Sequence, residues 1–239
     1  MNNQEIAEFY DEFSERQLKI GANERLISLY NRLLKLGLKN DSRILELGCG
    51  VGIFTKLLSK KIKNGAIEAV DLSEKSTEIA AKNLQKKAVN FVAADIVHYI
   101  PETKSLDFIT LLDVIEHIPL ELHSALFSNL AKICDQKTQL VINFPNPRYL
   151  EFVQKNNPKD LQIIDQSIEL RDLVAILDNA GLEIIFYEKY NIWEVEDYDF
   201  LAVRKKRNFE LKHLADQRSL LEKIVHKIEL KINQIKYNT

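Results

Sequence analysis

The stretch RILELGCGVGIFT, from Arg43 to Thr55, joins a strand-like apolar run to helix-like sequence through three closely spaced glycines. The chain must reverse sharply there, which favours residues that are free to adopt a positive φ. Glycine also lets the backbone approach a ligand closely, because no Cβ intervenes. A helix that begins near Gly52 would point its free N–H groups and its positive dipole end at that ligand. The stretch therefore predicts a ligand-binding turn between a strand and a helix.

Short apolar runs alternate with helical patterns on both sides of this turn. The predicted strands are 43–47, 66–71, 89–93, 106–112, 138–144, 182–190 and 197–203. The predicted helices are 3–18, 23–36, 52–62, 74–86, 121–133 and 168–180, and a proline-containing segment occupies 145–158. Such alternation predicts an α/β fold, with a mostly parallel sheet covered by helices on both faces. The short connection from Asn191 to Glu196 predicts that the last two strands pair antiparallel.

The composition and charge narrow the class of protein. Apolar residues make up 46% and charged residues 28% of the 239 residues, as in ordinary globular enzymes and binding domains. The net charge of −2 gives no global field that favours nucleic acid. Two cysteines, Cys49 and Cys134, form no disulfide framework and suit a reducing compartment. The segment MNNQEIAEFYDEF resembles no signal peptide, and no apolar run reaches the roughly 18 residues that span a bilayer. We therefore expect a cytoplasmic protein without stable membrane insertion.

The spacing of the glycines departs from the dinucleotide-binding pattern G-x-G-x-x-G, because Ile53 occupies the place of its third glycine. The segment ELGCGVG, residues 46–52, instead resembles motif I, E/D-x-G-x-G-x-G, of the class I S-adenosylmethionine (SAM)-dependent methyltransferases. The resemblance implies a Rossmann-like sheet of seven strands, mostly parallel with an antiparallel last strand. It also implies that SAM is the cofactor. A plain glycine-rich loop is the alternative for the motif taken alone.

Acidic residues at the ends of the next two predicted strands fit the same resemblance. Asp71 ends the second strand, where a carboxylate can accept hydrogen bonds from both hydroxyl groups of a ribose. Asp95 follows the third strand, and in this fold such an acid usually faces the adenine amino group while the next residue, Ile96, packs on the ring. For any single acid, a solvated strand end is the alternative. The resemblance covers roughly residues 41–145 and implies a cofactor site made of Glu46, Gly48, Cys49, Gly50, Asp71, Leu72, Asp95, Ile96 and the Leu112 backbone.

The fourth predicted strand runs into LDVIEHIP, which resembles the D-V-(I/L)-E-H stretch common in small-molecule methyltransferases, including those of ubiquinone biosynthesis. His117 is the candidate catalytic base for a hydroxyl acceptor, because the pKa of histidine suits proton transfer near neutrality. The alternative is that His117 only shapes the cofactor pocket, and Glu116 is then structural or orients it. Asp113, Glu116, His117 and His123 match no compact metal-ligand spacing, so no metal is expected.

The N-terminal segment FYDEFSERQLKIGANERL resembles that of a group of bacterial methyltransferases of this fold. The resemblance implies a helical cap over 1–40, with Tyr10 over the cofactor. Gln17 and Arg25 are candidates for substrate binding, because Arg25 can hold a carboxylate through two parallel hydrogen bonds. An amphipathic helix that carries surface charges is the alternative.

The second half of the chain matches the family only in layout. The segment VINFPNPRYL is similar to the N/D-P-P-Y/F motif of amino-directed nucleic-acid methyltransferases, but it follows the fifth strand and Phe144 separates Asn143 from Pro145. That activity is therefore not carried over. Asn143 and Asn146 remain candidates for lining the acceptor pocket, against the alternative of a proline-shaped loop. Gln162 lies in a polar loop that suits a polyhydroxylated acceptor such as a sugar.

The tail 208–236 carries apolar residues at the alternating spacing of three and four that marks a coiled-coil seam. We expect three regions: the cap 1–40, a SAM-binding core 41–205, and a C-terminal helical region 206–239. A homodimer through the C-terminal helix is the main interpretation. Packing onto the chain's own domain and adsorption to an anionic membrane are the alternatives.

These features predict an enzyme, a SAM-dependent O-methyltransferase that acts on a small polar metabolite or a saccharide. A non-catalytic SAM-binding or assembly protein is one alternative, and a methyltransferase acting on tRNA or protein is another. The acidic core and the lack of a clear nucleic-acid module speak against RNA, so no nucleic-acid partner is expected.

Overall fold

The computed structural model describes residues 18–161, 164–208, 211 and 218–237. The chain divides into two compact units, Met1–Lys206 and Arg207–Thr239. The first unit carries the sheet, and the second carries the C-terminal helix. Among the described residues, none of the helices combines the length and apolar character that a bilayer crossing requires.

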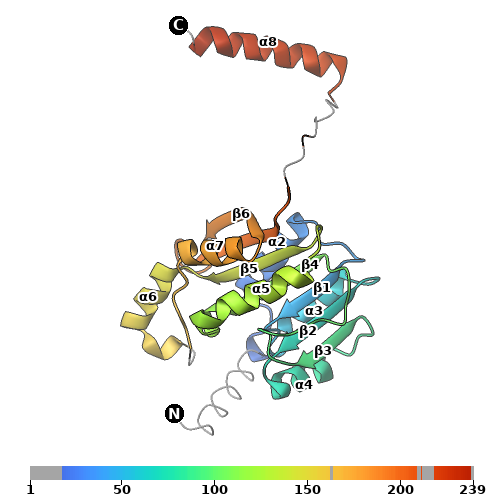
Figure 1. Cartoon of the computed structure of the whole chain (residues 1–239), viewed down its shortest axis with the longest axis vertical. Coiled ribbons are helices and arrows are strands. Elements are labelled where there is room, and N and C mark those ends of the chain that lie inside the picture. Colours follow the sequence, from blue (N-terminus) through green and yellow to red (C-terminus); the bar gives the residue numbers. More distant parts are fainter. Residues whose placement is uncertain (1–17, 162–163, 209–210, 212–217, 238–239) are drawn as a thin grey trace. The chain divides into compact units, whose positions relative to one another are not determined.

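One sheet of seven strands forms the centre of the first unit (Figure 1). The strands are β1 (Arg43–Leu47), β2 (Ala66–Asp71), β3 (Val89–Ala93), β4 (Phe108–Leu112), β5 (Gln139–Pro145), β6 (Leu182–Tyr190) and β7 (Tyr198–Lys205). Their order is β3-β2-β1-β4-β5-β7-β6. The strands β1 to β5 pair in parallel, whereas β7 runs antiparallel to both β5 and β6. The predicted α/β fold, with an antiparallel last strand, is confirmed.

Helices cover both faces of this sheet. They are α2 (Glu24–Lys35), α3 (Ile53–Lys61), α4 (Glu74–Asn83), α5 (His123–Ile133), α6 (Pro147–Asn156) and α7 (Leu170–Asn179), and the second unit contains α8 (Leu220–Tyr237). Apolar residues of α5 and α7 pack on one face of the sheet, and those of α2 and α3 pack on the other (Figure 1). Successive residues of β1 divide between the two cores, with Ile44 in one and Leu45 in the other, as the alternation of a strand requires. Burial on both faces is what a parallel strand such as β1 needs.

The proline-containing segment 145–158 differs from expectation, because the sequence predicted neither a helix nor a strand there. Most of it forms the helix α6, which Asn146 caps by accepting a hydrogen bond from the Arg148 N–H, at 2.9 Å. Pro147 occupies the first helical position, where a missing N–H costs nothing. The proline is therefore a helix start.

The strand order predicts a ligand site beyond the carboxyl ends of the strands. The chain runs outward from β1 to β3 on one side, and β4 returns to pair with the opposite edge of β1. In open α/β sheets of this kind, ligands lie beyond the carboxyl ends of the strands at the point where the order reverses. The glycine turn that follows β1 lies at this point.

Two glycines provide a matched test of the fold. A Cβ added to Gly65 would lie 1.9 Å from the Ser42 carbonyl oxygen, so backbone must move to admit it. A Cβ on Gly181 would meet nothing within 4 Å, although its φ of 77° is strained for other residues. We expect Gly65→Ala to lower the free energy of unfolding by about 3 kcal/mol or more, and Gly181→Ala by about 1–2 kcal/mol. Chemical denaturation measures both, and equal losses would contradict the predicted backbone clash.

Candidate functional site

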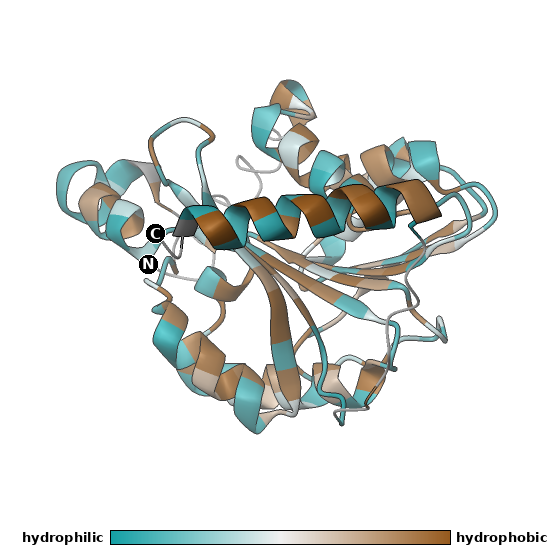
Figure 2. Cartoon of the chain, turned by 90° about the horizontal axis from the view of Figure 1, so that it is seen from above, coloured by the Kyte–Doolittle hydropathy of each residue, from teal (hydrophilic) through white to brown (hydrophobic). Residues whose placement is uncertain are grey.

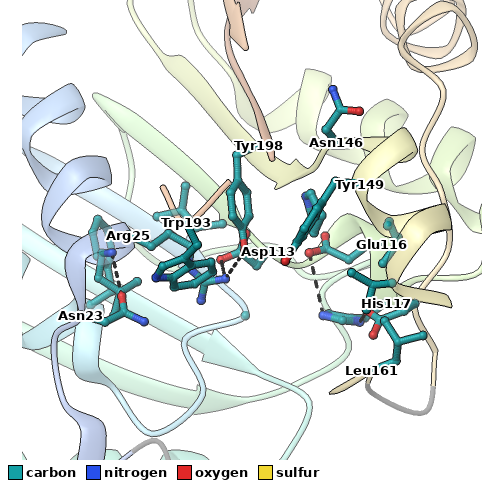
Figure 3. Close-up of a pocket in the computed structure, with 18 of the residues that line it drawn as sticks. Asn23, Arg25, Asp113, Glu116, His117, Asn146, Tyr149, Leu161, Trp193 and Tyr198 are labelled. Carbon is teal, nitrogen blue, oxygen red and sulfur yellow. Dashed lines mark hydrogen bonds and ion pairs between the residues drawn. The ribbon is translucent and has the colours of Figure 1, made fainter. Parts of the chain in front are cut away.

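A cavity of about 1030 Å³ opens beyond the carboxyl ends of β1, β4 and β5 (Figure 3). Its lining residues come from the segments 20–26, 46–54, 112–117, 145–157 and 189–198, together with Leu161 and Asp165. The cavity thus joins the glycine turn to the β4 end, to α6 and to the turn between β6 and β7. Its size suits a cofactor and an acceptor together.

The glycine turn has the geometry that its sequence predicts. Gly48, Gly50 and Gly52 all have positive φ, at 76°, 50° and 77°. A Cβ on Gly48 would lie 2.3 Å from the Val114 Cγ2 atom, so the turn packs directly against the segment after β4. The Gly48 and Cys49 N–H groups both donate to the Val70 carbonyl oxygen, at 2.8 and 3.0 Å. These bonds fix the cradle against β2, and Gly48, Cys49 and Gly50 line the cavity.

Asp71 fixes the glycine turn from the end of β2. One oxygen of its carboxylate accepts a hydrogen bond from the Gly50 N–H at 2.7 Å, and the other accepts from the Ser73 N–H at 2.9 Å. Each carboxylate oxygen has a second lone pair, so this role leaves capacity to accept a ligand hydroxyl. Leu72 beside it is exposed.

Asp95 and Ile96 follow β3 on the same edge of the sheet. Asp95 is exposed and accepts a hydrogen bond from the Val97 N–H at 2.9 Å, whereas Ile96 is buried. Together with Asp71 and Leu72, these residues lie outside the lining of the cavity, while Leu112 lies within it. A ligand that reached all of the predicted cofactor residues would therefore extend from the cavity along the ends of β2 and β3.

Glu46 is a buried acid at the wall of the cavity. Its side chain is only 4% exposed, and its Oε2 atom has no hydrogen-bond partner among the described residues. Burial, reinforced by the nearby Asp71 carboxylate, raises the pKa of Glu46 to about 8. Buried polar atoms are normally satisfied, so this oxygen is suited to a donor that a ligand supplies. The ammonium group of SAM is such a donor, and with the glycine cradle this meets the needs of the predicted cofactor.

Arg25 reaches the cavity from the first turn of α2. Its guanidinium lies 2.8 Å from the Asp113 carboxylate and donates a hydrogen bond to the Tyr198 hydroxyl at 2.9 Å. The guanidinium carbon lies 5.7 Å from the ring centre of Trp193 and 5.6 Å from that of Tyr198. The start of the helix is capped by Asn23, which accepts from the Leu26 N–H at 3.0 Å. The Arg25 side chain is therefore contacted by three residues, Asp113, Trp193 and Tyr198 (Figure 3).

Asp113 has a strained backbone conformation, as does Glu196 elsewhere in the cavity lining. The φ of Asp113 is 57°, in the left-handed region that non-glycine residues seldom occupy. Asn143 donates a hydrogen bond from Nδ2 to the Asp113 carboxylate at 2.8 Å and accepts one from the Tyr190 hydroxyl at 2.7 Å. Burial raises the pKa of Asp113, and the ion pair with Arg25 opposes this rise. Asn143 itself is fully buried and is not among the lining residues, so the structure gives it contact with Asp113 in place of the predicted contact with the acceptor pocket.

His117 follows β4 in a short helical turn, Ile115–His117, and lines the cavity. Its Nδ1 atom lies 3.1 Å from the Asp165 carboxylate and 2.5 Å from the Ile164 carbonyl oxygen. Its Nε2 atom lies on the side of Glu116, at 3.9 Å. An imidazole held in this way through Nδ1 presents Nε2 for chemistry, because the carboxylate fixes the tautomer.

The pKa of His117 lies above the neutral range that the sequence analysis assumed. Burial opposes the charged imidazole, but the hydrogen bond to Asp165, the nearby Glu116 and the Ile164 carbonyl outweigh it and raise the pKa to about 9. Glu116 is buried, and burial raises the pKa of its carboxyl group. At neutral pH the histidine therefore carries a proton.

The remaining candidate residues differ in whether they line the cavity. Asn146 lines the cavity but is buried as the cap of α6, so its side-chain oxygen is occupied by the helix. Tyr10, Gln17 and Gln162 lie outside the described residues. Tyr149 of α6 also lines the cavity, although no pattern in the sequence predicted a helix or a binding role there.

Comparison with known sequences decides the family. The family model described as a methyltransferase domain matches residues 15–186, well over half of the chain. The chain belongs to the methyltransferase-domain family. The predicted resemblance to the SAM-dependent methyltransferases is thereby confirmed, and with it the enzyme class and the SAM cofactor as properties of the family.

This methyltransferase is 28% identical over 163 residues to malonyl-[acyl-carrier protein] O-methyltransferase 1 of Ilyobacter polytropus, covering 64% of this chain and 60% of that protein. It is 28% identical over 112 residues to the ribosomal protein L11 methyltransferase of Thermotoga neapolitana, covering 46% and 39% of the two chains. The alignments thus span less than two thirds of the length of both relatives.

A solved structure shares the fold. Magnesium protoporphyrin IX methyltransferase from Synechocystis PCC 6803, with S-adenosylhomocysteine (SAH) bound, superposes with a TM-score of 0.59 and 23% identity. The match covers 75% of this chain and 81% of that chain. At this identity the likeness is one of architecture.

The contact between His117 and Asp165 generates a prediction with a definite sign. Because the pKa of His117 is raised from 6.5 to about 9, its ionisation stabilises the fold fully below 6.5, and this contribution is lost as pH rises through about 9. We expect Asp165→Asn to lower the pKa of His117 and to destabilise the protein at acidic pH more than above the folded-state pKa.

Titration of the imidazole resonances by NMR, assigned with His117→Gln, measures this pKa. Denaturation at the two pH values measures the stability. Asp172→Asn, the same change at an exposed site on α7, is the matched control and should alter neither. An unchanged pKa for His117 in Asp165→Asn would contradict the assigned contact.

Proposed function

We propose that this chain transfers the methyl group of SAM to an oxygen of a small polar acceptor, with saccharides as the substrate class. The observation that carries the proposal is one cavity shared by two kinds of group. The glycine turn and the unpartnered Glu46 oxygen lie at its β1 wall, and His117 with Asp165 lies beyond β4. SAM, when bound, supplies an electrophilic methyl carbon on a sulfonium.

The cofactor residues are proposed from their positions around the β1 turn. Gly48, Cys49 and Gly50 would cradle the amino-acid end of SAM, with Glu46 beside its ammonium group. Asp71 would accept the ribose hydroxyls, while Leu72, Asp95 and Ile96 would surround the adenine beyond the cavity. Tyr10 remains a proposed cover over the cofactor.

The acceptor reacts by in-line displacement, so the chain must align its oxygen with the methyl–sulfur bond and exclude water. An oxygen–carbon bond forms, the carbon–sulfur bond breaks, and the electron pair stays on the sulfur of SAH. The hydroxyl proton passes to His117 as the general base. Since the pKa of His117 is about 9, the competent neutral imidazole is the minor form at neutral pH. Turnover should therefore increase as pH rises toward about 9.

Among the residues that we propose bind the acceptor, Arg25 carries a positive charge. The first relative is by name an O-methyltransferase, which supports oxygen as the acceptor atom. Gln17, Asn146 and Gln162 remain proposed contributors to the acceptor pocket, and Asn143 acts through Asp113 as a positioning residue.

The first test is SAH release from SAM with a mixed acceptor panel, with and without a chelator. The panel holds nucleotide sugars, sugar phosphates, hydroxy acids, phenols, an acyl-carrier protein and bulk tRNA. We expect chelator-resistant turnover on the sugars, with a rate that rises to a plateau above about pH 9, in line with the pKa of His117. His117→Ala should lower turnover by roughly 10²-fold or more, with little change in SAM affinity. Turnover confined to tRNA or to the carrier protein would contradict the proposed acceptor class.

We also propose that α8 pairs with a second copy of the chain. Within this helix Leu221, Val225, Ile228, Ile232 and Ile235 continue the spacing of three and four, and all are exposed in the single chain. Figure 2 shows apolar residues recurring along α8 between hydrophilic ones. A seam of this kind is stabilised when each apolar residue packs between residues of a facing helix.

The dimer is tested by a charge at the seam. Ile228→Asp places a carboxylate among the apolar positions and should convert a dimer to a monomer, since burying an unpaired charge is costly. His226→Asp adds the same charge two residues away, outside the spacing, and should leave the dimer intact. Light scattering measures the mass, and a monomeric wild-type chain would contradict the proposal.

A further inference from the structure

Trp193 lies in the turn between β6 and β7 and lines the cavity (Figure 3). It is the only tryptophan in the chain, and its side chain is 52% exposed. Tryptophan side chains are usually well buried. An indole that is half exposed inside a cavity therefore indicates a ligand-binding surface more than a core position.

The turn that carries Trp193 is held by hydrogen bonds to a buried carboxylate. Asp197 is fully buried, and its carboxylate accepts hydrogen bonds from the Ile192, Trp193 and Glu194 N–H groups, at 2.8, 2.9 and 3.1 Å. The side chain of Asn191 closes the turn by accepting from the Glu196 N–H at 2.8 Å. The indole is thus presented on a pre-organised backbone, which lowers the entropy lost when a ligand stacks on it.

Two side chains fix the indole on its inner side. The Tyr198 ring meets it nearly edge-on, with ring centres 5.9 Å apart and planes at 66°. The Arg25 guanidinium carbon lies 5.7 Å from its centre, and Arg25 is itself held by Asp113. These contacts set the tilt of the indole, and its remaining surface faces open space.

Charged side chains line the cavity together with Trp193. Glu194 follows Trp193 in the chain, Lys189 and Glu196 come from the same hairpin, and Arg148 of α6 lines the cavity as well. An acyl chain packed on the indole would strip water from such groups and offer them no partner, which costs free energy. A sugar ring has an apolar C–H face that can stack on the indole and a rim of hydroxyls that can both donate and accept hydrogen bonds. The charged part of the lining therefore favours a polyhydroxylated ring.

We propose that Trp193 is the stacking platform of a saccharide subsite, and that this subsite selects which ring hydroxyl reaches His117. The inference rests on the proposed function, because it names how the acceptor of that reaction is held. It assigns Trp193 the role of a specificity-determining residue and the Asp197-braced turn the role of its support.

The single tryptophan makes the subsite directly observable. The SAH-saturated protein is titrated with methyl glucoside, a nucleoside-diphosphate sugar, catechol and an octanoyl thioester while indole fluorescence is recorded at its red excitation edge. We expect a saturable change with one or both sugars. A change with catechol or the thioester alone, or with none of the four, would overturn the proposal.

Variants separate this inference from the reaction itself. With the sugar that is turned over, Trp193→Ala should raise KM roughly tenfold and lower kcat less, and Trp193→Phe should recover part of the loss. Val174→Ala, an exposed apolar residue of α7 outside the cavity, is the control for truncation. If Trp193→Ala turned over the sugar as the wild type does, the proposed subsite would be wrong and the proposed methyl transfer would be unaffected. A chain that binds no SAM would instead refute the proposed function.

Discussion

The site depends on a partly buried ion pair between Arg25 and Asp113, which ties the N-terminal helix to the end of β4. Asp113 is held there in a left-handed backbone conformation and is fixed from below by Asn143, which Tyr190 orients in turn. Breaking one partner would leave an uncompensated charge in a cavity wall, which is far more costly than losing a surface pair. The pair therefore fixes one wall of the cavity, and Trp193 and Tyr198 pack against its arginine.

Around this pair the acids divide by environment. Glu46 lies in a buried wall, where desolvation raises its pKa to about 8, whereas Asp71 is held by backbone N–H groups. A carboxyl group with its pKa raised in this way is poised to ionise when a cationic ligand arrives, because the ligand replaces the lost hydration. On the other side, Asp165 keeps His117 protonated at neutral pH. In the proposed reaction, Glu46 ionises when the cofactor binds, whereas His117 must lose its proton before it can accept one from the acceptor.

The fold could be predicted from the sequence because its signals are local. The glycine turn and the apolar runs predict the observed bounds of β1, β2 and β3. Serine is a typical N-cap residue, and Ser73 caps α4 in the structure. The cavity walls formed by α6 and Asp165 could not be predicted in the same way. Helix α6 starts at Pro147, in a segment for which the sequence predicted no element, and the contact of Asp165 with His117 joins segments 48 residues apart. Such contacts depend on tertiary packing, which no local pattern encodes.

Calorimetric titration of the chain with SAH measures most directly whether the β1 turn and its neighbours form the proposed SAM site. We expect one saturable site per chain in the wild type. We also expect binding to be lost in Gly48→Val, because the added side chain would clash with the Val114 side chain. Circular dichroism checks that this variant remains folded. A folded wild-type chain that shows no heat of binding with SAH would contradict a SAM site at this turn.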